Sequence, residues 1–139
     1  VWDARTGEAR LTRDVRNARI PEFSPDGRRL AVPEGSAGNS HIVVFDVATF
    51  EEVKRWPCDA KADRVVYDRT SKFLAARDGD SVALYDSETG KLVTRLESTN
   101  APNGMAFSPT ADLLAVEHVL PGWTNGEGRW VSNARVVLY

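Results

Sequence analysis

Three side chains of the sequence have the chemistry of nucleophiles, bases or metal ligands: the one cysteine, Cys58, and the two histidines, His41 and His118. A thiol within hydrogen-bond reach of an imidazole is an activated nucleophile, and the same groups bind zinc. No short motif joins the three residues, and we expect them on different sheets, on the order of 10 Å or more apart. The sequence therefore predicts a buried cysteine and two histidines at strand ends, with no catalytic residue and no metal site.

A second candidate for ligand chemistry is the acidic sequence RDGDS, residues 77–81. It is similar to the start of a calcium loop, but the glycine and glutamate that complete such a loop do not follow. We expect a tight hairpin turn in which Asp80 accepts hydrogen bonds from nearby backbone N–H groups. Gly35, Gly38 and the glycines of NGEG (125–128) are too loosely placed to hold a phosphate, so no cofactor is predicted.

The segment VLPGWTNGEGRWVSN (119–133) places two tryptophans among glycine, asparagine and proline. Trp123, Trp130 and Arg129 are of the residue types enriched at binding hot spots. The alternative is a hairpin extension in which the two rings stack across the strands and hold the loop to its sheet. With Arg64 and Arg77, these three residues are the predicted contacts for a protein partner.

The sequence segments that would position these residues occur in three similar copies along the chain. FSPDGRRLAV (23–32) returns as YDRTSKFLAA (67–76) and again as FSPTADLLAV (107–116). Each copy leads to an apolar run that ends in an aromatic residue, at Phe45, Tyr85 and Tyr139. Such self-similarity indicates a repeat architecture.

Each unit is expected to contain four short strands separated by turns. Proline, aspartate and glycine in FSPDG favour a tight turn, and the aspartate and glycine of DARTGE and DSETGK favour another. Phe50 stands where this second turn should have glycine, so the turn there must differ or carry strain. No amphipathic helical period appears, and the fold class is all-β.

A unit of about 40 residues with four strands, an FSPDG turn and an aromatic–Asp pair resembles the WD-repeat β-propeller family. The Gly-His pair that precedes the first strand in that family is absent, so the resemblance is to a divergent, bacterial-type member. It implies an open β-propeller segment of about three four-stranded antiparallel blades over residues 1–139. The repeat units run approximately over residues 4–46, 47–86 and 87–139.

The resemblance also implies which loops share a face. Most of the length variation falls between the second and third strands of a unit, at residues 33–40, 77–81 and 119–133. These connections should open on the same face as the inter-blade loops around residues 16, 58–64 and 100–104. We expect a protein partner to bind this face.

The charge and composition bear on which other classes of partner, and which compartment, are expected. A formal net charge of -2 argues against nucleic-acid binding. No apolar run approaches the ~20 residues that span a bilayer, so no membrane contact is expected. A single cysteine gives no internal disulfide, which favours the cytoplasm.

The expected function is a non-catalytic protein–protein interaction platform, part of a larger WD-like propeller, because three units are too few for a closed ring. The alternative is a propeller enzyme or small-ligand binder whose active site lies mostly in blades outside these residues. The mostly apolar first strands, ARIPEF, DRVVYD and NGMAFS, disfavour it. Two chains could also pair into a six-bladed ring, each lending Glu8–Asp14 as the outer strand that the other lacks.

Overall fold

The computed structural model describes residues 1–10, 12, 14–36, 38–58, 62–97, 102–124 and 130–139, and its strands lie in three antiparallel sheets. The first sheet contains β1 (Glu22–Phe23), β2 (Arg29–Ser36), β3 (Asn39–Asp46) and β4 (Glu52–Cys58). The second contains β5 (Ala62–Tyr67), β6 (Phe73–Asp78), β7 (Ser81–Asp86) and β8 (Leu92–Glu97). The third contains β9 (Pro102–Phe107), β10 (Leu114–Thr124) and β11 (Trp130–Leu138), in the order β11-β10-β9.

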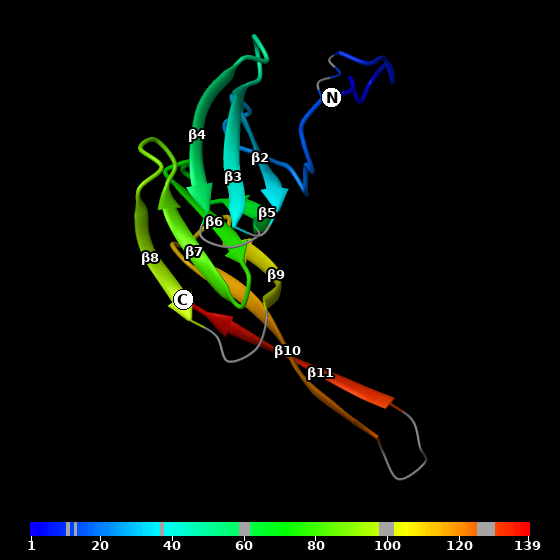
Figure 1. The fold of residues 1–139 in the computed structure, drawn as a ribbon, viewed down its shortest axis with the longest axis vertical. Helices are drawn as coiled ribbons and strands as arrows, with labels where there is room; N and C mark the ends of the chain where they lie inside the picture. The colour runs from blue at the N-terminus through cyan, green and yellow to red at the C-terminus, as the bar shows by residue number, and fades with distance from the viewer. Residues whose placement is uncertain (11, 13, 37, 59–61, 98–101, 125–129) are drawn as a thin grey trace.

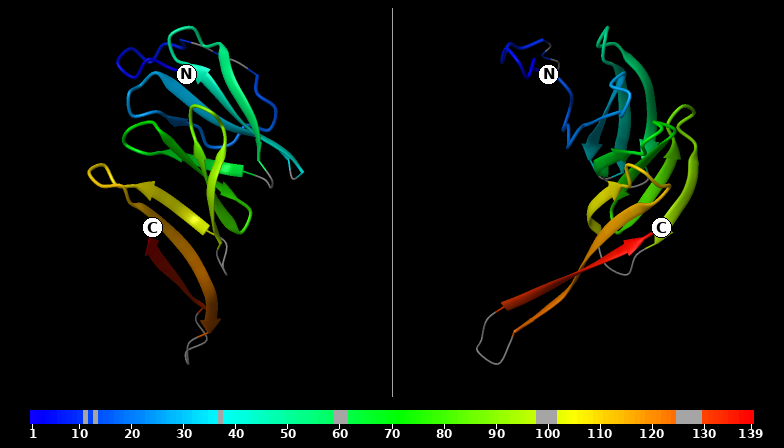
Figure 2. Two further views of the ribbon diagram at one scale, coloured as in Figure 1. Left: turned by 90° about the vertical axis from the view of Figure 1, so that its left-hand side faces the viewer. Right: turned by 180° about the vertical axis from the view of Figure 1, so that it is seen from behind.

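The predicted all-β fold class is confirmed. No helix occurs among the described residues, and the sheets follow one another as successive layers (Figures 1 and 2). In each of the three sheets, neighbouring strands are consecutive in the chain, and among the described residues no sheet closes on itself. The molecule is therefore an open arc of three propeller-like blades. Within the part of the chain that the structure describes, no helix could span a membrane.

The turn that begins with aspartate has the same geometry in all three copies. Asp46 Oδ1 accepts hydrogen bonds from the backbone N–H groups of Ala48 and Thr49, and the Phe50 N–H donates to the Asp46 carbonyl oxygen at 2.7 Å. Asp3 and Asp86 accept the matching bonds. Phe50 has φ 58° in this turn, so the strain expected there is present, because a bulky side chain disfavours the left-handed region.

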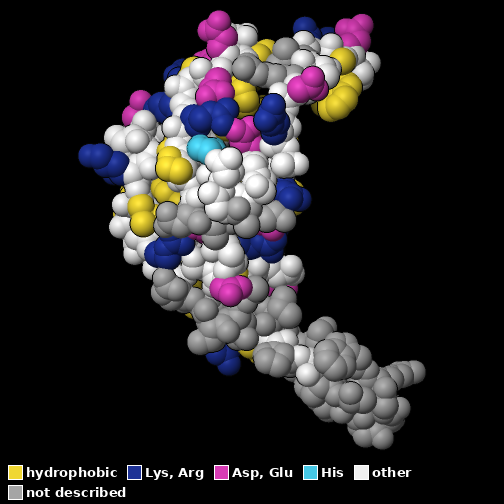
Figure 3. Space-filling model, viewed as in Figure 1, with side chains coloured by type: hydrophobic (Ala, Val, Ile, Leu, Met, Phe, Trp, Pro, Cys, Tyr) yellow, Lys and Arg dark blue, Asp and Glu magenta, His cyan; other side chains and the backbone are white. Residues whose placement is uncertain are grey.

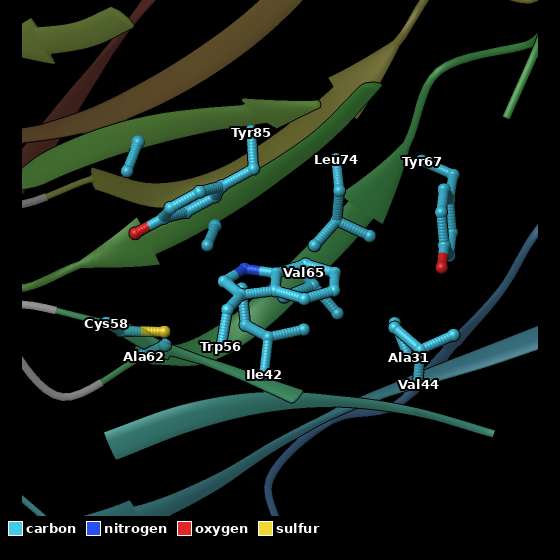
Figure 4. Close-up of a cluster of buried hydrophobic side chains, with 12 residues drawn as sticks. Ala31, Ile42, Val44, Trp56, Cys58, Ala62, Val65, Tyr67, Leu74 and Tyr85 are labelled. Atoms are coloured by element: carbon cyan, nitrogen blue, oxygen red, sulfur yellow. The ribbon is translucent and has the colours of Figure 1, made fainter. Parts of the chain in front are cut away.

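The first two sheets share one core, drawn in Figure 4. Trp56 projects from β4 into the layer between the sheets, and its ring centroid lies 6.2 Å from that of Tyr85 on β7. Ile42 and Leu74 are completely buried in the same cluster. Fully burying one such side chain stabilises the fold by roughly 1.5–3 kcal/mol. The contact between neighbouring sheets is therefore a main source of stability.

Strand β5 is buried on both faces. Val65 packs into the cluster shared with the first sheet, and Val66 packs with Met105 and Val116 into the cluster shared with the third sheet. Successive side chains of a strand point to opposite faces. An apolar sequence without alternation is therefore what a strand between two sheets requires.

The described residues of the segment 8–14 form no strand within the single chain, and their role as an outer strand lent to a second chain stays a prediction. Among the described residues of this segment, pairing is limited to an isolated bridge between Trp2 and Ala9. A strand needs a neighbouring ladder to satisfy its backbone, and no other strand of the described chain lies beside this segment. Val15, just beyond it, packs on the outer face of the first sheet against a cluster that includes Phe45.

Two connections expected to vary in length are largely strand, and at residues 119–133 the backbone pairing is that of the hairpin extension given above as the alternative. Across residues 33–40, β2 continues to Ser36 and β3 begins at Asn39, with Ser36 paired to Asn39. Across residues 119–133, β10 continues to Thr124 and β11 begins at Trp130, with a bulge between Leu120 and Trp123. Once two strands are in register, continued pairing satisfies backbone groups that a loop would expose to water.

Candidate interaction surface

Arg77 is held between two sheets. It lies on β6, and its guanidinium donates to both carboxylate oxygens of Asp63 on β5, with Nε 2.5 Å from Oδ1. Its Nη1 donates to the carbonyl oxygen of Pro102, the first residue of β9, at 2.9 Å. The bond to Asp63 raises the pKa of Arg77. This arginine, predicted as a partner contact, therefore joins the second sheet to the third; its role toward a partner stays a prediction.

The Asp63–Arg77 pair has a counterpart in the next unit. Asn103 on β9 donates through Nδ2 to Glu117 Oε2 on β10 at 3.2 Å. A Cβ at the neighbouring Gly104 would lie 2.9 Å from the same carboxylate oxygen. Sequence reasoning missed both pairs. Their shared offset between first and second strand could have revealed them once the repeat was aligned.

Arg64 is the cross-strand partner of Arg77, and its backbone also bridges to Ile20, which precedes β1. The side chain is half-buried. Burial raises the pKa of Glu22, and the positive charge of Arg64 opposes that increase. Arg64 and Glu22 therefore place opposite charges where the first two sheets meet.

Trp123 and Trp130 belong to the paired strands of the β10–β11 hairpin, opposite Val131 and Thr124 respectively. The hairpin extends away from the body of the molecule at the end opposite the first sheet (Figure 1). Arg129, the third predicted contact in this segment, and the NGEG glycines at 125–128 lie outside the described residues. The backbone pairing agrees with a hairpin extension.

The RDGDS turn is a tight hairpin as predicted, but a different aspartate is bonded in it. Asp78 pairs with Ser81, and Gly79 between them has φ 66°. The buried carboxylate of Asp78 accepts a hydrogen bond from Arg95 Nη1 at 2.7 Å, and the same nitrogen donates to Ser81 Oγ. The Asp78 side chain faces the sheet, where it contacts the arginine of β8, whereas Asp80 is exposed.

Cys58 and His41 share the first sheet, so the prediction that they lie on different sheets was wrong for this pair. Cys58 pairs with Ser40 and His41 pairs with Pro57 across β3 and β4. These are successive registers, so the two side chains point to opposite faces. Cys58 is buried, as expected, and His118 is buried in the third sheet. Among the described residues no group of His, Cys, Asp or Glu could hold a metal ion.

A groove of about 500 Å³ opens between the second and third sheets. Its apolar wall includes Leu84, Leu96, Phe107, Leu114 and Tyr139. Several polar and charged side chains complete the lining: Asp68, Arg69, Thr70, Lys72, Thr94 and Asp112. It is an apolar depression with charges of both signs around it.

A smaller groove of about 180 Å³ occupies the matching place between the first and second sheets. Tyr67 stands there in the position that Phe107 has in the larger groove, and burial raises the pKa of Tyr67 to about 12. Ser87 and Glu88, from the turn of the second sheet, also line the smaller groove. The two grooves are thus repeat-equivalent but differ in size and polarity.

The surface charge is mixed. On the face shown in Figure 3, Lys and Arg side chains are interspersed with Asp and Glu, and small hydrophobic patches lie between them. Over the described residues, the face in view therefore carries both signs of charge and no wide area of one sign.

No family model matches the chain, and no curated protein matches it. Solved structures do match. Hydrazine synthase of Kuenenia stuttgartiensis superposes with a TM-score of 0.69 at 18% identity, over 89% of this chain and 37% of that chain. The Cps50 (Swd1) β-propeller domain of Myceliophteria thermophila superposes with a TM-score of 0.66 at 16% identity, over 91% of this chain and 41% of that one.

These likenesses show the fold: the three sheets are blades of a β-propeller. The chain spans about two fifths of the length of the structures that it matches.

Proposed function

We propose that the chain is part of a larger, divergent WD-repeat-type propeller that acts as a non-catalytic platform for protein–protein interaction. The observation that carries the proposal is the β10–β11 hairpin, whose strands of 11 and 9 residues continue well past β9, the third strand of their sheet. Trp123 and Trp130 lie in its far part. Tryptophan is enriched at the centres of protein interfaces.

Contacts between neighbouring sheets support this role. Arg77 ties the second sheet to the third, and Lys54 Nζ ties the first sheet to the second through Glu88 at 2.6 Å. A surface that is already ordered loses little conformational entropy when a partner binds. The blades would hold the hairpin in place without moving.

The test compares partner capture by the wild-type chain with capture by the Trp123→Ala/Trp130→Ala double variant. Proteins retained from an extract of the native organism would be identified by mass spectrometry, and the affinity of each purified candidate measured. We expect binding weaker by about tenfold or more, with an unchanged β-sheet circular dichroism spectrum. Trp2→Ala is the matched control, because Trp2 is 71% exposed and lies far from the hairpin in the sequence.

Loss of the sheet spectrum in the double variant would instead support the alternative in which the two rings pin the hairpin. Unchanged affinity in a folded double variant would contradict the proposed contact site.

One comparison favours a second function. The neighbour from Kuenenia stuttgartiensis is named as an enzyme, hydrazine synthase. A propeller enzyme or small-ligand binder would place its active site mostly in blades outside these residues. The absorbance spectrum of the purified protein is the test, since a bound chromophoric cofactor would favour this second function.

A further inference from the structure

The smaller groove is formed by two complete blades. Its lining comes from the first and second sheets alone, and each of these sheets contains four strands. The groove measures about 180 Å³, well above the roughly 10–15 Å³ that admits one water molecule. No third blade is needed to form it, so the side chains of these two blades determine what it can bind.

Tyr67 brings a buried hydroxyl to this groove. The residue is 7% exposed and lines the groove from β5. Its hydroxyl points toward the first sheet, where Ala31 and Val44 lie (Figure 4), and forms no hydrogen bond with the described residues. Burial raises the pKa of Tyr67 to about 12, so the hydroxyl keeps its proton and can donate. A buried hydroxyl normally has a partner, and here the groove is where such a partner can lie.

The repeat provides an internal comparison for this lining. Three positions are more polar in the smaller groove than in the larger one: Tyr67 corresponds to Phe107, Arg29 to Phe73 and Lys54 to Thr94. The larger groove lies between sheets that form with the less polar residues, so the propeller fold requires neither the hydroxyl nor the two cations. These groups are therefore available for a ligand.

The carboxylates in or beside the smaller groove already have partners. Asp26 accepts hydrogen bonds from the Ser24 hydroxyl and the Arg28 N–H, Glu88 pairs with Lys54, and Asp46 pairs with Arg29. The groups that lack a partner are donors. The Arg28 guanidinium forms no hydrogen bond with the described residues, and the Arg29 guanidinium donates through Nη1 only. An acceptor, rather than a cation, is the ligand that these groups require.

We propose that the smaller groove binds one small oxyanion, a phosphate or a carboxylate group, between the first two blades. The Tyr67 hydroxyl donates to the anion from inside the groove, and the guanidinium groups of Arg28 and Arg29 donate from its rim. Arginine presents several N–H donors in a plane, an arrangement that suits both phosphate and carboxylate oxygens. The site is separate from the β10–β11 hairpin, so it stands or falls independently of the proposed partner binding.

The first test is a titration of the 139-residue chain with inorganic phosphate and, separately, with acetate, with sodium chloride used to hold the ionic strength constant. Nuclear magnetic resonance of the chain with labelled tyrosine rings reports the contact, and the Tyr67 signals are assigned by their absence in Tyr67→Phe. We expect these signals to shift saturably while those of Tyr139 do not. Saturation with phosphate alone would define a site for a tetrahedral anion, and saturation with acetate alone a carboxylate site.

Variants then locate the anion. Tyr67→Phe should weaken binding by roughly tenfold or more, because a hydrogen bond to a charged group is lost. The sheets should tolerate this change, since Phe23 and Phe107 occupy the equivalent positions. Arg28→Gln should also weaken binding. Arg135→Gln is the matched control, because it removes the same charge from β11 of the third sheet and should leave the affinity unchanged.

The absence of a saturable shift of the Tyr67 signals with either anion would overturn the proposal. So would wild-type affinity, measured by calorimetry, in folded Tyr67→Phe and Arg28→Gln variants. An equal loss of affinity in Arg135→Gln would show that the anion only screens surface charge, and would overturn it as well. Circular dichroism checks that each variant is folded; if Tyr67→Phe is not, the exposed Arg28 still provides the comparison. Partner capture by the hairpin variant is a separate measurement and bears only on the proposed function.

Discussion

Trp56 of the first blade lies directly on Gly90 of the second: a Cβ at position 90 would be 2.9 Å from Cδ2 of the ring. Gly90 also has φ 69°, a conformation that side chains disfavour. The indole Nε1 is buried and has no hydrogen-bond partner among the described residues, so packing is what holds the ring in place. One glycine thus serves both the turn and the contact between blades.

Gly90→Ala should therefore lower the free energy of unfolding by about 2–4 kcal/mol, combining backbone strain with overpacking. Gly27→Ala is the control, because Gly27 has φ 71° but nothing lies within 4 Å of its Cβ position. Gly27→Ala should lower the free energy of unfolding only by the contribution of backbone strain, about 1–2 kcal/mol. Urea unfolding of both variants measures the difference, and equal losses would show that the Trp56 contact is not tight.

A substitution at Phe50 should change stability in the opposite direction and raise the free energy of unfolding. Its φ of 58° stands where Gly7 and Gly90 have 74° and 69° in the equivalent turns. Phe50→Gly should raise the free energy of unfolding by roughly 0.5–1 kcal/mol, because relief of the left-handed strain exceeds the extra entropy of glycine in the unfolded chain. Phe50→Ala keeps the strain and should not stabilise. A less stable glycine variant would mean that the packing of the Phe50 ring outweighs its strain.

The repeated aspartate turns predict how stability responds to acid. Hydrogen bonds from the backbone N–H groups of Thr49 and Ala48 lower the pKa of Asp46, and the backbone and hydroxyl of Thr89 lower that of Asp86. The unfolded chain then binds more protons than the folded one as pH falls through about 4, the ordinary aspartate value. The stabilisation is present above that pH and is lost as pH falls through the lowered values.

Urea unfolding at neutral pH and at about pH 3 measures this loss. Asp46→Asn keeps an acceptor oxygen in the turn but cannot titrate, so its stability should fall less with acid than that of the wild-type chain. An identical pH dependence in the two proteins would rule out Asp46 as a contributor.

The three sheets could be predicted because each is bounded by local turn chemistry. An aspartate followed by a left-handed residue defines its own hydrogen bonds over a few positions, and even Phe50 does not abolish them. The lengths of the hairpins could not be predicted. Whether β10 continues to Thr124 depends on pairing with β11, which no residue type in the segment signals.

The same distinction applies to the candidate site. Residue type alone singles out Arg77 and Trp123 as candidates, but the contacts of Arg77 come from residues that are distant in the sequence. Its partner Asp63 is on another strand, and the Pro102 carbonyl belongs to another sheet. Neither the proximity of Arg77 to Asp63 nor its proximity to Pro102 can be read from a single sequence. Only the alignment of the repeats could have placed residue 77 near residue 63.

The contacts of Arg77 predict a structural effect that must be separated from any effect on binding. Arg77→Met removes the cation beside Asp63 and the donor to the buried Pro102, and should lower the free energy of unfolding by about 1–3 kcal/mol. Arg64→Ala should change it by less than about 1 kcal/mol, since that side chain is half-buried and interacts with Glu22 only through charge. Urea unfolding compares the two, and equal losses would contradict the bridging role of Arg77. Weaker partner binding by Arg64→Ala at unchanged stability would then identify Arg64 as a partner contact. For Arg77→Met, the loss of affinity would identify a contact only if it is larger than the loss expected from the smaller fraction of folded protein.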